Sequence, residues 1–239
     1  LDTGSDRSPL AAIGERWRAM EGQLAVHRDA LVTDLVERLT GRTPRSVLMV
    51  GPSGCGKGAL VDAALHRWQG DPDRAFPGAW RLSGTRIVAG QSGFGAWQER
   101  CQAILDAVAR SGAVLLLDHL WELAGVGQSQ SNDSSIADFF APALARGTVL
   151  AVAEATTEER RLLARDAPHL LNAFDIVEVP ALDAETRRAV LASVWRHRCA
   201  DRQHGRDLPA GILDLVEHLH RRFAGYSALP GRSLRFLEA

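Results

Sequence analysis

A glycine-rich turn between a short apolar run and a helical stretch constrains this sequence more than any other feature. The run Ser46–Val50 shows no alternation of polar and apolar residues along its length, which is typical of a strand buried on both faces of a parallel sheet. It leads into Gly51-Pro52-Ser53-Gly54-Cys55-Gly56-Lys57-Gly58, and helical spacing follows through Trp68. A strand, then Gly-x-x-x-x-Gly-Lys, then a helix is the context of a phosphate-binding loop. The sequence therefore predicts an α/β fold with a site for a phosphorylated ligand.

The residue types of this loop indicate what it binds. Glycines let successive backbone N–H groups converge on phosphate oxygens, and the N-terminus of the next helix adds partial positive charge. The nucleotide is expected to be ATP or ADP, and Lys57 is expected to reach the β-phosphate and, in ATP, the γ-phosphate. The predicted nucleotide contacts in this segment are Pro52, Ser53, Gly54, Cys55, Gly56, Lys57, Gly58 and Ala59. A glycine-rich turn with an incidental lysine is the alternative, and Cys55 can also be a small residue that fills space.

The position after the lysine departs from the usual pattern. It is normally Ser or Thr, whose hydroxyl binds Mg²⁺, whereas this chain has Gly58. A second apolar run, Ala113–Leu117, ends in Asp118, and an acid at the carboxyl end of a strand can hold the Mg²⁺ of a phosphate-loop site. Asp118 is the predicted metal residue. Because Gly58 offers no ligand, we expect a weakened Mg²⁺ site.

The remaining pattern predicts a nucleotide-binding domain followed by a helical subdomain. Residues 1–10 read as a tail or linker, 11–180 as the α/β domain and 181–239 as an all-helical part. Apolar residues at helical spacing predict a helix from about Ala11 to Leu39, and the runs Val149–Ala153 and Ile176–Val179 predict further strands. After Asp183, a plausible N-cap, three helices are expected; the second presents Ile212, Val216, Leu219 and Phe223, and the third starts near Gly231.

Three later segments of the sequence indicate one protein family. They are Asp118-His-Leu-Trp-Glu-Leu-Ala-Gly-Val-Gly127, Pro142-Ala-Leu-Ala-Arg-Gly147 and Ala155-Thr-Thr-Glu-Glu-Arg160. They resemble the first nucleotide-binding module of the Clp family of AAA+ protein unfoldases, which has Asp-Glu-Leu-His, Lys-Pro-Ala-Leu-Ala-Arg-Gly and Gly-Ala-Thr-Thr in the same order. Further matches at Leu24–Asp29, Val88–Arg100 and Leu229–Leu234 extend the resemblance to the C-terminus. The resemblance implies an AAA+ domain with a parallel sheet flanked by helices and a small helical lid.

The resemblance also implies roles for residues outside the phosphate loop. Val26 and His27 lie in the segment that contacts the adenine, and Arg232 in the last lid helix corresponds to an arginine near the phosphates, although a surface arginine is the alternative. Thr156 or Thr157 follows a buried strand, at a place where a polar side chain of the family senses the γ-phosphate. An N-terminal turn of the next helix explains a threonine there equally well.

Several working positions of the family are changed in this chain. His119 stands where the family has its catalytic glutamate, so it is either a substitute base or a replacement without catalytic role. Asn172-Ala173 replace paired arginines that act on a neighbour's γ-phosphate, and losing such a residue typically removes about 10³–10⁵ in rate. Gly93 aligns with the tyrosine that grips substrate, with Phe94 one place along.

Composition excludes several other classes. The formal net charge of -1 supplies no global attraction to nucleic acid or anionic lipid. Three widely spaced cysteines fit neither a disulfide framework nor a zinc site, which suggests a reducing, cytoplasmic environment. No run approaches the ~20 apolar residues of a membrane helix, and the N-terminus does not resemble a signal peptide.

Two functions fit these observations best. Four working positions differ together from the pattern of the family: Gly58, His119, Asn172-Ala173 and Gly93. We therefore favour an ATP-binding module with weak or absent hydrolysis and a structural or regulatory role. The alternative is an active ATPase motor that drives protein remodelling. A nucleotide kinase is a third reading, which the segment 142–147 and the helical C-terminal part disfavour. Expected partners are copies of the chain in a ring or a neighbouring AAA+ module of a longer protein, with an unknown protein partner.

Overall fold

The computed structural model describes residues 9–19, 25, 27–90, 95–127 and 134–200, and single positions at 211, 212, 215, 218, 219 and 222. The chain divides into two compact units, each described by itself below. The first comprises Leu1–Arg18, Glu37–Val50 and Asp71–Val177. The second comprises Ala19–Val36, Gly51–Gly70 and Glu178–Ala239.

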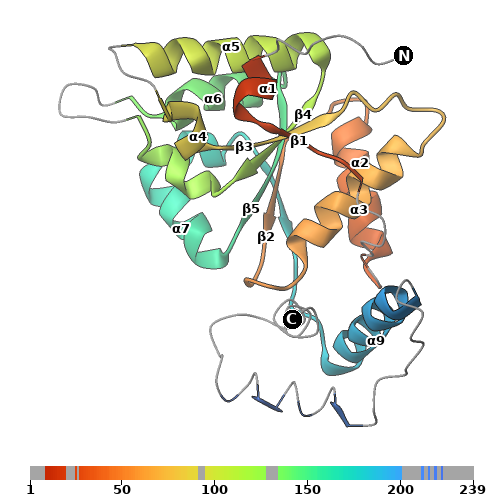
Figure 1. The fold of residues 1–239 in the computed structure, drawn as a ribbon. Helices are drawn as coiled ribbons and strands as arrows, with labels where there is room; N and C mark the ends of the chain where they lie inside the picture. Colours follow the sequence, from red (N-terminus) through yellow and green to blue (C-terminus); the bar gives the residue numbers. More distant parts are fainter. Residues whose placement is uncertain are drawn as a thin grey trace. The chain divides into compact units, whose positions relative to one another are not determined.

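A six-stranded sheet organises the first unit (Figure 1). Its strands are β1 (Glu15–Arg16), β2 (Val47–Val50), β3 (Ala79–Ser83), β4 (Val114–Asp118), β5 (Leu150–Ala155) and β6 (Asp175–Glu178). Their order across the sheet is β1-β3-β4-β5-β2-β6. The pairs β3–β4, β4–β5 and β5–β2 are parallel, and β1 pairs antiparallel with β3 at one edge. The sheet is therefore mostly parallel and is flanked by helices, as expected.

Four of the six strands were predictable from local sequence. The apolar runs that end at Val50, Leu117, Ala153 and Val179 correspond to β2, β4, β5 and β6. All four residues of β2 and the first four of β4 are buried, as expected for strands covered on both faces. The sequence pattern missed β1 and β3. Two of the five residues of β3 are polar and β1 has only two residues, so neither makes an apolar run.

The prediction of one continuous helix from Ala11 to Leu39 is wrong, because this segment holds parts of two helices with a short strand between them. A short helix, α1 (Pro9–Ile13), ends at Gly14, Glu15–Arg16 form β1, and the long helix α2 runs only over Asp29–Thr40. Leu10 is buried in the core of the first unit, so the last residues of the expected tail are structured. The apolar spacing is real in α2, where Leu35 and Leu39 are buried.

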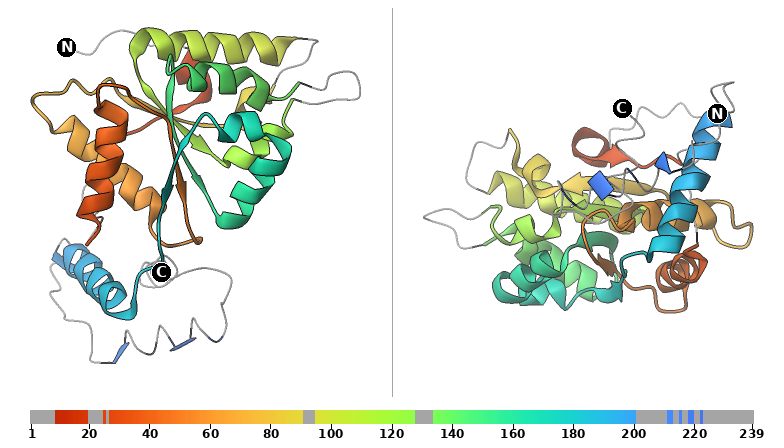
Figure 2. Two further views of the ribbon diagram at one scale, coloured as in Figure 1. Left: turned by 180° about the vertical axis from the view of Figure 1, so that it is seen from behind. Right: turned by 90° about the horizontal axis from the view of Figure 1, so that it is seen from below.

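The helices of the first unit pack around one continuous core. They are α4 (Gly84–Val88), α5 (Ala96–Ser111), η1 (Leu120–Ala124), α6 (Ile136–Ala145), α7 (Thr157–Asp166) and α8 (Pro168–Leu171), together with α1. Figures 1 and 2 show α5 and α6 side by side, in agreement with their contacts. Ile104 of α5 and Phe140 of α6 are fully buried with Leu115 and Leu117 of the central strand β4. This core fixes the strand ends from which the candidate site residues extend.

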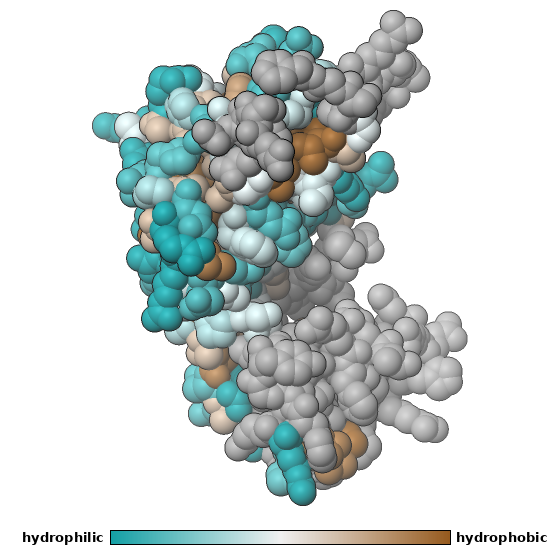
Figure 3. Space-filling view, turned by 90° about the vertical axis from the view of Figure 1, so that its left-hand side faces the viewer, coloured by the Kyte–Doolittle hydropathy of each residue, from teal (hydrophilic) through white to brown (hydrophobic). Residues whose placement is uncertain are grey.

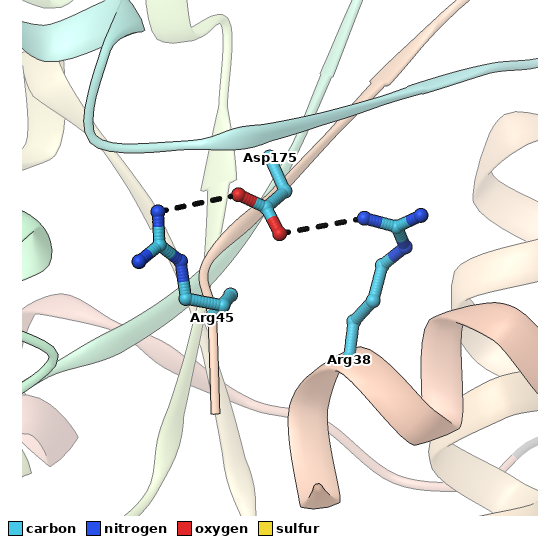
Figure 4. A network of polar contacts seen from close by, with 3 residues as sticks. All are labelled: Arg38, Arg45 and Asp175. Atoms are coloured by element: carbon cyan, nitrogen blue, oxygen red, sulfur yellow. Dashed lines mark hydrogen bonds and ion pairs between the residues drawn. The ribbon is translucent and has the colours of Figure 1, made fainter. Parts of the chain in front are cut away.

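Strand β6 is held at the edge of the sheet by one carboxylate and two guanidinium groups (Figure 4). Asp175 accepts from Arg38 Nη1 at 3.3 Å and forms an ion pair with Arg45 Nη2 at 3.4 Å. The backbone N–H of Asp175 also donates to the Ser46 carbonyl at 2.8 Å. Both arginines are thus engaged within the unit.

In the second unit, α3 (Lys57–Gln69) and α9 (Ala184–Ala200) are the long helices besides the first part of α2. Asp183 opens α9 as predicted, because its carboxylate accepts from the Thr186 N–H at 2.8 Å and from the Thr186 hydroxyl at 2.7 Å. These hydrogen bonds lower the pKa of Asp183. Of the second predicted lid helix, Ile212 and Leu219 are helical. Its Val216 and Phe223, and the third helix near Gly231, lie outside the described residues.

Among the residues that Figure 3 colours by hydropathy, most of the surface on this face is hydrophilic, with separate hydrophobic areas. Within the described residues, no helix is both long enough and apolar enough to cross a bilayer.

Candidate functional site

The phosphate-loop segment follows directly after β2 and belongs to the second unit. Gly54 and Gly56 have φ angles of 85° and 96°, a left-handed conformation that side chains with a Cβ rarely adopt. A Cβ built on Gly56 would meet no atom within 4 Å, so there is open space beside the backbone here. A left-handed backbone next to open space is what a loop needs if its N–H groups are to surround an anion.

The start of the loop is packed much more tightly. A Cβ built on Gly51 would lie 2.2 Å from the Val179 carbonyl oxygen and 3.1 Å from Cys55 Sγ. The Cys55 thiol is buried 3.7 Å from the same carbonyl, and burial raises its pKa. A buried thiol with a raised pKa is a poor nucleophile, so the contacts of Cys55 favour the space-filling interpretation over a reactive one.

Lys57 is the first residue of α3 and is held by the loop itself. Its Nζ donates to the Gly51 carbonyl at 2.8 Å and to the Pro52 carbonyl at 3.1 Å, and the residue is only 8% exposed. It is also the only lysine in the sequence, since the other 27 of its 28 Lys and Arg residues are arginines. An ammonium held at the N-terminus of a thirteen-residue helix, where backbone N–H groups also concentrate positive charge, favours phosphate.

The other predicted residues of the loop lie as follows. Pro52 and Ser53 are exposed, whereas Gly58 and Ala59 are partly buried in the first turn of α3. Gly58 has no side chain, so it lacks the hydroxyl that Ser or Thr provides at this position. The predicted adenine residue His27 is exposed and has a φ of 59°, and the next residue, Arg28, donates to the Pro180 carbonyl at 2.6 Å. Val26 and Arg232 lie outside the described residues.

The remaining candidates, Asp118, His119 and Thr156, belong to the first unit. Asp118 is the last residue of β4, and Thr156 follows the last residue of the neighbouring parallel strand β5. The sheet therefore brings these two residues to the same edge, as the carboxyl ends of parallel strands must meet there. The register pairs Leu117 with Ala153.

Asp118 has a partner that the sequence pattern did not suggest. Arg81 Nη1 donates to Asp118 Oδ1 at 2.8 Å, and the two side chains are 39% and 36% exposed. This pair could not be predicted from the sequence because strand β3 was not predicted. Without the strand, an arginine between Trp80 and Leu82 is taken for a loop residue.

His119 is the N-cap residue directly before η1 and has a left-handed conformation with a φ of 51°, and its side chain is exposed. Its carbonyl accepts from the Glu122 N–H at 2.9 Å. The backbone is thus bent sharply at the residue that stands in place of the family's glutamate. This contact involves only the backbone of His119, so it gives the imidazole no proton-transfer partner.

Thr156 forms the N-cap of α7. Its hydroxyl accepts from the Glu159 N–H at 3.2 Å, and the Glu159 carboxylate accepts from the Thr156 N–H at 2.6 Å, which completes a capping box. The helix-opening interpretation therefore accounts for this threonine, and the γ-phosphate role stays a prediction.

We expect Thr156→Ala to lower the free energy of unfolding by about 1 kcal/mol, the usual contribution of an N-cap side chain. Urea unfolding followed by circular dichroism measures the change, and Thr156→Ser should retain most of the stability. Thr157→Ala is the matched control, because Thr157 is exposed and already inside the helix. An equal loss in the Thr157 variant would contradict the capping role.

The positions that handle substrate and neighbours in the family are only partly described. Asn172 is exposed at the end of α8 and Ala173 is buried, so neither supplies a cation. Gly93 and Phe94 lie outside the described residues.

The residues present fit a nucleotide phosphate better than they fit Mg²⁺. The loop offers left-handed glycines, open space at Gly56 and the Lys57 ammonium. Among residues covered by the structure, no three or more His, Cys, Asp or Glu side chains are grouped so that they could hold a metal ion. In the second unit, Gly58 has no hydroxyl, and in the first unit Asp118 is paired with Arg81.

A mostly parallel sheet with a phosphate loop after one strand and an acid after another defines a P-loop nucleotide-binding domain. The chain belongs to the AAA family, the ATPase family associated with various cellular activities, whose family model matches residues 47–177. Within this family the chain is similar to Clp-type proteins, in agreement with the resemblance.

Relatives among characterised proteins support this assignment. The chaperone protein ClpB of Aquifex aeolicus is 26% identical over 241 residues, which cover 98% of this chain and 24% of ClpB. The ATP-dependent Clp protease ATP-binding subunit ClpE of Lactococcus lactis is 25% identical over 230 residues, covering 95% of this chain and 30% of ClpE. The chain thus spans less than a third of the length of these relatives.

Solved structures confirm the fold. The Saccharomyces cerevisiae Hsp104:casein complex in its extended conformation matches with a TM-score of 0.77 at 22% identity, covering 96% of this chain and 40% of that one. The Hsp104–ADP complex matches with a TM-score of 0.74 at 21% identity, covering 94% and 32%.

Proposed function

We propose that this chain is the ATP- or ADP-binding AAA+ module of a Clp-like chaperone or unfoldase, with weak or absent hydrolysis and a structural or regulatory role. The observation that carries the proposal is the loop Gly51–Gly58, in which Gly54 and Gly56 are left-handed, open space lies beside Gly56, and the only lysine of the sequence follows. Backbone N–H groups and one ammonium recognise phosphate without needing a catalytic residue.

The changes at the working positions argue for weak hydrolysis. Hydrolysis by a P-loop site needs a metal ion, a residue that orients the attacking water, and a cation for the transition-state charge. Gly58 provides no side-chain metal ligand, and Asn172 and Ala173 provide no charge. His119, the exposed N-cap residue before η1, replaces the glutamate of the family. Binding a nucleotide requires none of these three.

The proposed binding partners are inferred from similar proteins and not from contacts seen in this chain. Hsp104, whose AAA+ fold this chain shares, is named in complex with casein and with ADP. We propose that this module associates with copies of itself in a ring or with a neighbouring AAA+ module, and that the assembly acts on a protein. Such a non-hydrolysing module would position its neighbours.

Nucleotide binding and phosphate release, measured on one preparation, test the proposal. We expect saturable ATP binding, with phosphate release below detection that is unchanged in His119→Ala. Lys57→Met is the control for a contaminating ATPase, because a contaminant is unaffected by this variant. Turnover near ~1 s⁻¹, an ordinary enzyme rate, that is lost in Lys57→Met would instead establish the active-motor alternative.

A further inference from the structure

Two consecutive carbonyl groups, of Val179 and Pro180, contact two separate segments of the second unit. The Val179 oxygen lies against the start of the phosphate loop, 2.2 Å from where a Cβ on Gly51 would be and 3.7 Å from Cys55 Sγ. The Pro180 oxygen accepts from Arg28 Nη2 at 2.6 Å. All of these residues belong to the second unit. Arg28 thus connects its own segment to the backbone that packs against the phosphate loop.

The turn that contains Arg28 has a backbone that needs support from its surroundings. The Arg28 N–H donates to the Ala25 carbonyl at 3.3 Å, and His27 within this turn has a φ of 59°. A left-handed backbone is uncommon for a residue with a Cβ, and it persists where surrounding contacts fix it. His27 is exposed, whereas Arg28 is partly buried and bonded to Pro180. The Arg28 side chain therefore holds this turn, whose described residues Ala25, His27 and Arg28 are called the His27 turn below.

Electrostatics agree that the His27 turn lies near the phosphate loop. Burial raises the pKa of the Cys55 thiol, and the positive charges of Lys57 and Arg28 lower it to a smaller extent. Because the effect of a charge decreases with distance, the Arg28 guanidinium is close enough to act on a residue of the loop.

We infer that Arg28 is a positioning residue for nucleoside recognition: by bonding the Pro180 carbonyl, it holds the His27 turn beside the phosphate loop, where the turn contacts the nucleoside of a bound nucleotide. The inference rests on the proposed nucleotide binding. It adds a residue that governs recognition of the nucleoside separately from recognition of the phosphates.

The chemistry of the two segments supports this division. Backbone N–H groups and the Lys57 ammonium recognise phosphate oxygens, whatever group the phosphates carry. The His27 turn instead offers an exposed imidazole, an aromatic ring on which a nucleobase can stack. The Arg28 guanidinium is bonded to Pro180, so it acts through the turn rather than as a phosphate ligand.

The test compares ADP with inorganic pyrophosphate, which lacks the nucleoside, by calorimetric titration of the full chain. We expect Arg28→Gln to weaken ADP binding about tenfold and to leave pyrophosphate binding within about twofold of the wild-type value. Arg28→Lys should recover most of the ADP affinity, because an ammonium can also donate to a carbonyl. Lys57→Met should weaken binding of both ligands. Arg67→Gln is the matched control, since Arg67 belongs to the same unit but bonds Thr33 and Asp29.

A second measurement uses only the wild-type chain, so it does not depend on the folding of a variant. Both ligands should slow amide hydrogen exchange in the phosphate loop, whereas only ADP should slow it at Arg28. Equal protection of Arg28 by ADP and pyrophosphate, or none by ADP, would overturn the inference alone. The same holds if Arg28→Gln binds ADP as the wild type does or loses affinity for both ligands equally. A wild-type chain that binds neither ligand removes the proposed function as well.

Discussion

Lys57→Met is expected to weaken nucleotide binding by about 100-fold or more. A charged hydrogen bond contributes about 1.5–3 kcal/mol, and the lysine of a phosphate loop serves more than one phosphate oxygen. The structure already holds this ammonium at the loop through the Gly51 and Pro52 carbonyls, so little ordering is needed when a phosphate enters. Fluorescence titration with an ADP analogue measures the loss.

The control for this variant is Arg67→Met. Arg67 lies in the same helix, and its replacement removes the same unit of charge, but its guanidinium binds Thr33 and Asp29. We expect its dissociation constant to match that of the wild-type chain. Equal weakening in both variants would mean that the effect is general electrostatics rather than a phosphate contact at Lys57.

The single lysine allows a chemical version of the same experiment. An amine-reactive ester can modify only Lys57 and the N-terminal amine, because the sequence has no other lysine. Bound nucleotide should slow modification of Lys57, read by peptide mass spectrometry, while the N-terminal amine serves as the internal reference. Unchanged modification of Lys57 at saturating nucleotide would contradict its assigned role.

Gly51→Ala is expected to destabilise the protein by at least about 1–3 kcal/mol, the usual range for overpacking. Its Cβ would be 2.2 Å from the Val179 carbonyl oxygen, and neither atom is at the end of a flexible side chain. The backbone of the loop or of Val179 must therefore move. Chemical unfolding measures the loss of stability, and the titration above measures the accompanying loss of nucleotide affinity.

Gly70→Ala is the matched control in the same unit. Gly70 ends α3 in a right-handed conformation with a φ of -85°, and its added Cβ would be 3.6 Å from the His66 carbonyl, an ordinary contact. We expect no loss of stability, since alanine also restricts the unfolded chain. A Gly51→Ala protein as stable as Gly70→Ala would show that the close approach to Val179 does not persist in solution.

Local sequence was sufficient for the elements that carry their signal in a few consecutive residues. An uninterrupted apolar run marks a strand buried on both faces, which is why β2, β4, β5 and β6 could be predicted. The phosphate loop and the Asp183 cap are equally local, because both depend on backbone geometry that neighbouring residue types dictate. The family motifs then identified the Clp-type module.

Tertiary structure alone decided the features that join distant segments. Strands β1 and β3 exist because they pair with each other and with β4, and their sequences do not form an apolar run. The Arg81–Asp118 pair spans 37 positions and depends on strand register, which no short-range pattern encodes. The spacing of Gly51 and Lys57 predicted a phosphate loop, whereas the approach of Val179 to Gly51 and the loop carbonyls that hold Lys57 became visible only after the chain had folded.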